Sequence, residues 1–246
     1  MHEGAVDKTS SAQARNDLLA MFRQMTPSLG VLVLVYVIAT MAWLAASVPI
    51  ATWMGAYILR MLMFMGLAFA AAPFTRALYR FVAHGEVTWL PTLGRFDDNT
   101  RIFATYASLM TALYFVPPIG RELVVTLGWV AYADATWFIL CLAVWLIIIR
   151  STTLLPMAAL DPQRASWTHA LAHSRGQTIR YFFATTVPAA PAFIAMLVLV
   201  MLVVRGAMHA FVFFPVVVVL LLAIQLLPLS AATRIYLDER RREREG

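Results

Sequence analysis

Six apolar stretches, each long enough to cross a lipid bilayer as a helix, constrain this chain more than any other feature of its sequence. The clearest one runs from Gly128 to Ile149 and holds a single charged side chain, Asp134. An α-helix needs about 20 apolar residues to cross the ~30 Å hydrocarbon layer, because each residue adds about 1.5 Å. This stretch is therefore predicted to span a membrane.

The composition agrees with a membrane protein. Hydrophobic residues make up 61% of the 246 residues and charged residues 13%, whereas soluble domains carry roughly 45–50% and about 25%. A soluble globule needs more polar surface than this, and disorder needs low hydrophobicity, so both classes are excluded. The single cysteine, Cys141, excludes a disulfide scaffold. The expected fold class is all-α, a polytopic membrane helical bundle.

The chain is predicted to have three parts. Residues 1–28 form a cytoplasmic amphipathic segment, residues 29–230 a six-helix transmembrane domain, and residues 231–246 a charged cytoplasmic tail. The six spans are expected at about 29–48, 52–74, 102–118, 128–149, 184–204 and 211–230. The third is the weakest, because polar residues interrupt it and the pair Pro117–Pro118 is expected to end it.

The distribution of basic residues predicts the orientation of the bundle. Of 19 Lys and Arg residues, only Arg60, Arg121 and Arg205 lie outside the four polar segments or their helix boundaries; the segments are 1–28, 75–101, 150–183 and 231–246. The positive-inside rule places such segments in the cytoplasm. Both termini are therefore expected there, with the chain in a bacterial inner (plasma) membrane. The net charge of +6 is then a topology signal, and a nucleic-acid partner is not expected.

Three segments are predicted to lie at the cytoplasmic interface, with amphipathic helices among them. Ser11–Met25, Gly85–Arg101 and Asp161–Gly176 combine spaced apolar residues with charged neighbours. In the last segment, Asp161 is expected to cap the start of a helix and Gly176 to fit its C-terminal cap. The favoured interpretation is that these segments cover the bundle ends. A lipid-binding or partner-binding surface is the alternative.

Arg60 and Asp134 are the most informative charged residues inside the predicted spans. Ionisable groups within the hydrocarbon are costly, so they usually pair or face water. Both residues are predicted at similar depth in the outer halves of their helices, which favours an inter-helix ion pair that fixes packing. A substrate or proton site is the functional alternative. Snorkelling to the outer surface is the third, with Glu122 as another partner for Arg60.

No residue pattern in the sequence predicts catalysis, a cofactor or a metal. His169 and His173 are spaced to share a helix face. However, the Glu of the HExxH zinc motif is missing, and no Cys or acidic residue follows at a spacing typical of a third metal ligand. A solvated or headgroup-facing surface is therefore expected for this pair. Asp97 and Asp98 are interpreted as helix-capping residues rather than acid–base catalysts.

One stretch, residues 150–176, resembles a recurring pattern in bacterial membrane proteins: an arginine at a helix end, then a proline, an acidic residue and an amphipathic helix. Its members here are Arg150, Pro156, Asp161, Trp167, Ser174 and Gly176. The pattern is similar to the six-helix membrane domain attached to some glycerophosphoryl diester phosphodiesterases, and to related uncharacterised inner-membrane families. The acidic position is Asp161, where Glu is commoner, and His173 stands where a basic residue is usual. Because these residues include no phosphodiesterase catalytic domain, the resemblance implies an architecture and carries over no active-site residue.

The function expected from these features is that of a non-enzymatic membrane scaffold or interaction module. Its expected partners are the lipid bilayer and, as an open alternative, another membrane or cytoplasmic protein. The second hypothesis is a small transporter or exporter that uses Arg60, Asp134 and the proline-kinked fifth and sixth helices. A membrane enzyme acting on lipids is the least favoured class.

Overall fold

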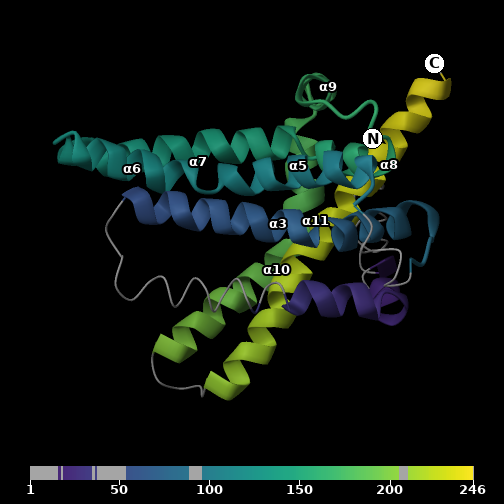
Figure 1. The fold of residues 1–246 in the computed structure, drawn as a ribbon, viewed down its shortest axis with the longest axis horizontal. Coiled ribbons are helices and arrows are strands. Elements are labelled where there is room, and N and C mark those ends of the chain that lie inside the picture. Colours follow the sequence, from purple (N-terminus) through teal and green to yellow (C-terminus); the bar gives the residue numbers. More distant parts are fainter. Residues whose placement is uncertain are drawn as a thin grey trace, which may run out of the picture.

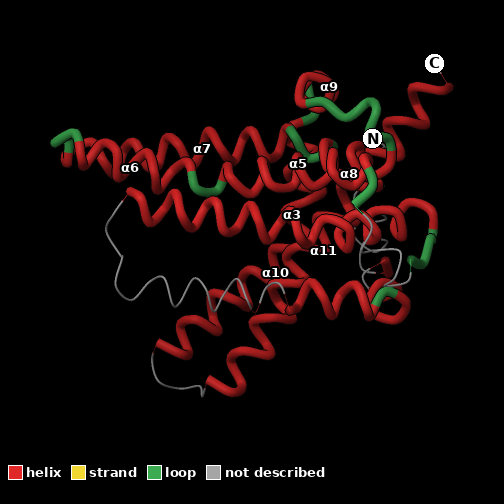
Figure 2. The backbone as a smooth tube through the Cα atoms, in the orientation of Figure 1, coloured by secondary structure: helices red, strands yellow, loops and turns green. Residues whose placement is uncertain are grey.

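The computed structural model describes residues 16–17, 19–34, 37, 54–88, 96–204 and 210–245. These residues form helices and loops without any strand, so the predicted all-α class is confirmed (Figure 2). We call the described residues among 16–34 the N-terminal segment. The elements after it are α3 (Met54–His84), α5 (Asp98–Leu113), α6 (Val116–Thr126), the 3-10 helix η1 (Val130–Tyr132), α7 (Ala133–Arg150), α8 (Leu154–Leu160), α9 (Trp167–His173), α10 (Thr178–Val204) and α11 (Ala210–Glu245).

Four helical stretches in the described ranges are long and apolar enough to cross a membrane: Gly55–His84, Val130–Leu160, Thr178–Leu199 and Val219–Glu245. They overlap the spans predicted at 52–74, 128–149, 184–204 and 211–230. A fifth is added if α5 and α6 cross together as one bent span, which covers the prediction at 102–118. The span predicted at 29–48 lies largely outside the described residues. Helices of this length and composition indicate a membrane location.

A bend of 44° separates α5 from α6. Pro117 and Pro118 fall in the first turn of α6, where a missing backbone N–H costs no helical hydrogen bond. The sequence prediction ended the span at Pro118, whereas the structure continues as helix to Thr126. Prolines that were expected to stop one helix therefore begin the next one.

The helices form two groups (Figure 1). α3, the α5–α6 pair and α7 lie side by side along the long axis of the molecule, and the hairpin of α10 and α11 crosses them obliquely. On α5, Ala104 and Ser108 are buried, and the Ser108 hydroxyl donates to the Met65 carbonyl of α3 at 3.0 Å. Small residues let membrane helices approach closely, so Ala104 and Ser108 allow α5 to pack against α3.

The main buried core lies where the N-terminal segment, α3, α5, α8 and α11 converge. Met21, Leu78, Phe103, Ala158 and Leu226 are at most 1% exposed there, one from each of these elements. The segments that meet at this core come from both ends of the described chain. The core therefore holds together parts of the sequence that no local interaction could join.

In contrast to the buried core, the outer faces of α7 and α10 expose apolar side chains. Large apolar side chains on both helices are more than half exposed: Phe138, Ile139, Phe193 and Val198. Apolar surface of this extent marks contact with a membrane or another protein. Together with the length of the helices, it indicates faces that contact lipid.

Candidate functional site

One end of the bundle, which we call the polar end, gathers most ionic contacts of the described residues. It comprises the start of the N-terminal segment, the C-terminal part of α3 with the residues that follow it, the start of α5, the end of α7, helices α8 and α9, and residues 230–245 of α11 (Figure 1). Apart from the pairs made by Arg121, the ion pairs among the described residues all lie there. The candidate site is built from these contacts.

α11 supplies one side of the polar end because it is longer than a membrane crossing requires. Its 36 residues measure about 54 Å at 1.5 Å per residue, against a hydrocarbon layer of ~30 Å. The predicted charged tail at 231–246 is thus a continuation of the same helix as far as Glu245. Two of its side chains reach the neighbouring helices: Arg240 pairs with Asp161 at the end of α8, and Glu243 lies beside His173 of α9.

Arg150 ties the end of α7 to the end of α9. Its Nε donates to Ser174 Oγ at 3.2 Å, and its Nη2 donates to the Leu171 carbonyl at 3.0 Å. That carbonyl belongs to the last turn of α9, where carbonyls have no helical partner. Ser174 is fully buried, and its hydroxyl donates to the same carbonyl at 3.0 Å. Two residues of the predicted motif therefore meet in one contact.

Asp161 ends α8 rather than starting the next helix. It is the C-terminal cap of α8, and Ser166 caps α9 instead by accepting from the His169 N–H at 3.1 Å. The prediction that Asp161 caps the start of this helix was wrong. Ser166 lies three residues before His169, which is the spacing that a capping side chain needs, whereas Asp161 lies too far from the first turn of α9.

The carboxylate of Asp161 holds the end of α11 against α8. Its Oδ2 lies 3.1 Å from Arg240 Nη2 and 3.7 Å from Arg164 Nε. Pro156 is fully buried in the first turn of α8, where proline is tolerated. The short helix α8 therefore packs into the core through its apolar residues and binds α11 through the carboxylate at its end.

Trp167 and Gly176 mark the two ends of α9. Trp167 is its first residue and packs against a cluster that contains Met110 and Leu154. Gly176 adopts a φ of +75°, a left-handed conformation that glycine tolerates best and that suits its predicted place after the helix. The turn at Gly176 directs the chain into α10, which begins at Thr178.

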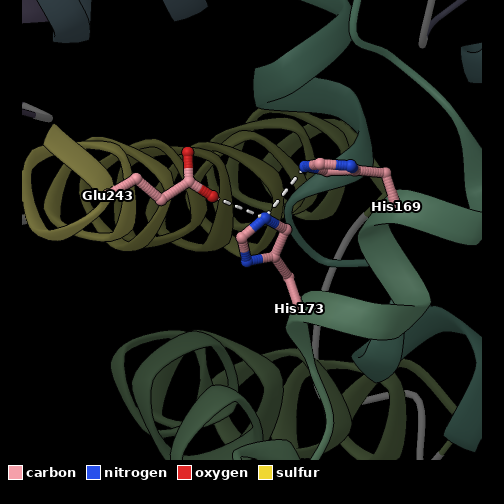
Figure 3. A group of neighbouring side chains, drawn as sticks. All are labelled: His169, His173 and Glu243. Atoms are coloured by element: carbon pink, nitrogen blue, oxygen red, sulfur yellow. Dashed lines mark hydrogen bonds and ion pairs between the residues drawn. The ribbon is translucent and has the colours of Figure 1, made fainter. Parts of the chain in front are cut away.

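Two histidines and a glutamate converge between α9 and the end of α11 (Figure 3). The Nε2 atoms of His169 and His173 lie 2.9 Å apart, and His173 Nε2 lies 2.8 Å from Glu243 Oε1. The ligand atoms of all three side chains lie within 4.8 Å of one another. These residue types can bind a metal ion, and among the described residues they form the group of this kind that the structure brings together.

A small cavity of about 10 Å³ lies beside this group and has room for one water-sized ligand. Its walls also include Tyr236, Glu239 and Arg240 from α11 and Arg164 from the turn after α8. Glu239 stands one turn before Glu243, and its Oε1 is buried with no hydrogen-bond partner among the described residues. Two glutamates and two histidines therefore border one small space.

Asp17 fastens the N-terminal segment to α11. Its carboxylate accepts from the Ser230 hydroxyl at 2.8 Å, from Arg234 Nε at 3.2 Å and from Arg234 Nη2 at 2.9 Å. Two parallel N–H···O bonds from one guanidinium give a geometrically specific contact. The N-terminal segment is thereby part of the polar end.

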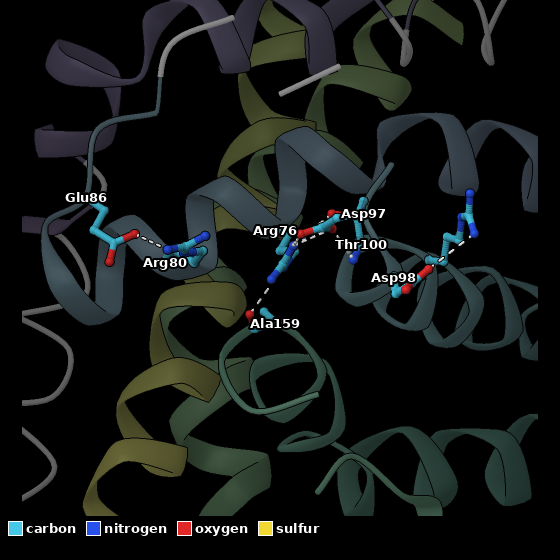
Figure 4. Close-up of polar contacts among 8 residues, drawn as sticks. Arg76, Arg80, Glu86, Asp97, Asp98, Thr100 and Ala159 are labelled. Atoms are coloured by element: carbon cyan, nitrogen blue, oxygen red, sulfur yellow. Dashed lines mark hydrogen bonds and ion pairs between the residues drawn. The ribbon is translucent and has the colours of Figure 1, made fainter. Parts of the chain in front are cut away.

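Arg76 joins three helices in the same region (Figure 4). From α3, its Nη1 lies 3.0 Å from Asp97 Oδ1 and donates to Thr100 Oγ1 at 2.8 Å, while its Nε donates to the Ala159 carbonyl of α8 at 3.3 Å. Asp97 accepts from the Thr100 N–H at 2.7 Å and caps α5. Its predicted capping role is confirmed.

The surroundings of Asp97 lower the pKa of its carboxyl group. Partial burial acts in the opposite direction and raises the pKa, but hydrogen bonds from Thr100 and the charge and hydrogen bond of Arg76 outweigh it. The start of a helix also favours a negative charge at this position. Asp97 is therefore held as a carboxylate that accepts bonds from two helices.

The structure places Asp134 beside Arg121 rather than Arg60. Asp134 Oδ1 lies 3.1 Å from Arg121 Nε, and the side chain of Asp134 is 89% exposed. Arg60 is buried in α3, with its guanidinium 5.7 Å from the ring centre of Tyr57. An Arg60–Asp134 ion pair is not among the pairs that the described residues form. The α6–α7 hairpin brings Arg121 close because only a short turn separates the two helices.

Sequence reasoning missed the acidic residues that complete the histidine group. Glu239 and Glu243 lie in the tail, whose mixed charges indicate a solvated segment. Their i, i+4 spacing is the one signal that pointed to a shared helix face. No sequence pattern indicated the contacts of Asp17, because its partners Ser230 and Arg234 are more than two hundred residues away in sequence.

No family model, no curated protein and no solved structure matches this chain. The resemblance to the membrane domain of glycerophosphoryl diester phosphodiesterases therefore stays a prediction. What the geometry adds is that motif residues Arg150 and Ser174 are in contact and that Asp161 binds the end of α11.

Proposed function

We propose that this chain is a non-enzymatic integral protein of the bacterial inner membrane that acts as a scaffold or interaction module. One observation carries the proposal: ion pairs and hydrogen bonds fix separate parts of the chain into one polar end, beside helices with exposed apolar faces. A binding surface works best on rigid elements whose side chains are held by their neighbours. The polar end has this property.

The proposed topology has six spans, with both termini and the polar end on the cytoplasmic side. Its support is the placement of charge: Arg76, Arg150 and Arg234 make their contacts at the polar end, whereas Arg121 pairs at the opposite tip. Basic residues concentrate on the cytoplasmic side of membrane proteins. In this proposal, α9 and the N-terminal segment cover the cytoplasmic ends of the spans.

Single-cysteine labelling tests the orientation. Cys141 is the only cysteine in the sequence, so a Cys141→Ala background accepts one new cysteine at a time. In intact spheroplasts, a membrane-impermeant maleimide should label Thr126→Cys at the end of α6. Arg242→Cys in the tail should react only after the membrane is permeabilised. The reverse pattern would contradict the orientation.

The scaffold role is tested by native copurification combined with transport measurements. A stoichiometric partner should copurify with the full chain in mild detergent and be lost when exposed tail arginines are reversed, as in Arg242→Glu with Arg244→Glu. Arg121→Glu at the opposite tip is the matched control and should keep the partner. A substrate flux in proteoliposomes that Asp134→Asn abolishes would replace the scaffold with the transporter hypothesis.

A further inference from the structure

We propose that His169, His173 and Glu243 form a binding site for a divalent transition-metal ion, best suited to Zn²⁺, which clamps α9 to the end of α11. The site is separate from the scaffold role, and either proposal can fail without the other. Its support is the geometry, hydrogen-bonding capacity and charge of the residues in Figure 3.

The three ligand atoms are already close to the positions that a metal requires. Bonds of about 2.0–2.2 Å from tetrahedral Zn²⁺ to imidazole nitrogen and carboxylate oxygen place neighbouring ligand atoms roughly 3.3 Å apart. The two short contacts of His173 Nε2 are 2.9 Å to His169 and 2.8 Å to Glu243. Side-chain shifts of about half an ångström would open the space for the ion, and exposed side chains can make such shifts.

A proton network does not satisfy these atoms as well as a cation does. A neutral imidazole nitrogen either donates one hydrogen or accepts one. His173 Nε2 faces both His169 Nε2 and Glu243 Oε1. If it donates to Glu243, it cannot accept from His169, and if it accepts from His169, it faces the carboxylate with a lone pair. A metal ion uses the lone pairs of all three atoms at once.

Two acidic side chains stand beside the histidines. Glu243 supplies a carboxylate, and Glu239 Oε1 is buried without a hydrogen-bond partner in the described part of the chain. Burial raises the pKa of Glu239 to about 7, so this group is only partly ionised at neutral pH. The neighbouring guanidinium groups of Arg164 and Arg240 share the single carboxylate of Asp161, which offsets one of their two positive charges. The adjoining cavity has room for one water-sized ligand, so a metal-bound water can reach Glu239.

The ligand types select the class of metal. Mg²⁺ and Ca²⁺ prefer sets made only of oxygen ligands. Two imidazoles with one carboxylate are typical of Zn²⁺ and suit other late first-row ions such as Ni²⁺ and Cu²⁺. Because three protein ligands leave a fourth position open, a water molecule or Glu239 can complete a tetrahedral set.

Zinc titration of the purified full chain tests the proposal. The chain should carry a tag without histidines, be treated with a chelator, and then be titrated with Zn²⁺ in competition with a chromophoric chelator. We expect one tight site per chain, and His169→Gln, His173→Gln and Glu243→Gln should each weaken it by about 100-fold or more, since even indirect neighbours of a metal contribute 10–100-fold. Co²⁺ should give the intense visible spectrum of a tetrahedral site.

Matched controls make the test decisive. His84→Gln replaces a histidine at the end of α3, and Glu245→Gln replaces a neighbouring glutamate of α11; both should leave zinc affinity unchanged. Elution volume and helical circular dichroism confirm that each variant is folded. The proposal is overturned if folded wild-type protein binds no zinc, or if the ligand variants bind it as tightly as the two controls.

Discussion

At the polar end, Arg234 binds Asp17 through two hydrogen bonds that join the N-terminal segment to the last helix. At the opposite tip, Arg121 binds Asp134 within a single helical hairpin, and the side chain of Asp134 is almost fully exposed. Both contacts are ion pairs, but only the first closes a long loop of chain. The comparison indicates that contacts at the polar end hold distant parts of the chain together. The ion pair at the tip, in contrast, adds little to a hairpin that residues close in sequence already form.

The largest difference between the two regions should appear when an aromatic side chain is truncated. Phe103 is fully buried in the core of the polar end, whereas Phe138 on α7 is 64% exposed. We expect Phe103→Ala to lower the free energy of unfolding by about 3–5 kcal/mol, and Phe138→Ala by less than about 0.5 kcal/mol. Unfolding in detergent micelles measures both. Equal losses would show that the polar end is not the stable part of the molecule.

Replacing an arginine at each end should give a smaller contrast. Arg150→Gln leaves the Leu171 carbonyl and the buried Ser174 hydroxyl without their charged donor, so we expect a loss of about 2–3 kcal/mol. Arg121→Gln breaks an exposed ion pair, so its expected loss is below about 1 kcal/mol. The same unfolding measurement checks both. A larger loss for Arg121→Gln would reverse the comparison.

The closure made by Asp17 can be tested by hydrogen exchange. Asp17→Asn removes the charge that binds Arg234, and we expect a loss of about 1–2 kcal/mol together with faster amide exchange in residues 19–34. Asp98→Asn is the control, because Asp98 forms an exposed ion pair with Arg101. If exchange in residues 19–34 stays at the wild-type rate, other contacts hold the N-terminal segment.

The smallest predicted effect concerns how the stability of the fold changes at low pH. The folded pKa of Asp97 lies below its ordinary value of 3.8, so its carboxylate stabilises the fold above that value, and the contribution disappears as the pH falls through the lowered folded pKa. Asp97→Asn should therefore lower the melting temperature at neutral pH and differ less from wild type in acid. Thr100→Val removes one of the hydrogen bonds and should give a weaker version of the same profile. A constant difference at every pH would contradict the assignment.

Apolar patterning predicted most of the helices, because a membrane span leaves a long signature in the sequence. It failed at Pro117–Pro118, since proline is compatible with the start of a helix as well as with its end. The first turn of α9 was misplaced for a similar reason: Asp161 and Ser166 are both good capping residues, and only tertiary structure selects between them.

Long-range polar contacts were the least predictable part of the candidate site. Depth along the helices made Arg60 and Asp134 equal candidates for a pair, but depth says nothing about which helices are neighbours. Arg121 is closer to Asp134 in sequence, so the entropy cost of closing the loop between them is smaller. Likewise, the histidine spacing on α9 was visible, but Glu243 reaches it only because α11 continues as a helix through the tail.

The length of α11 has a mechanical consequence. Its 36 residues measure about 54 Å when straight, and tilting a straight helix of that length by about 10° moves one end by roughly 9 Å relative to the other. Membrane helices tilt to match the thickness of the hydrocarbon layer. Because the contact between Glu243 and His173 is made near the end of α11, we expect a change in the tilt of this helix to alter the distance between these two residues.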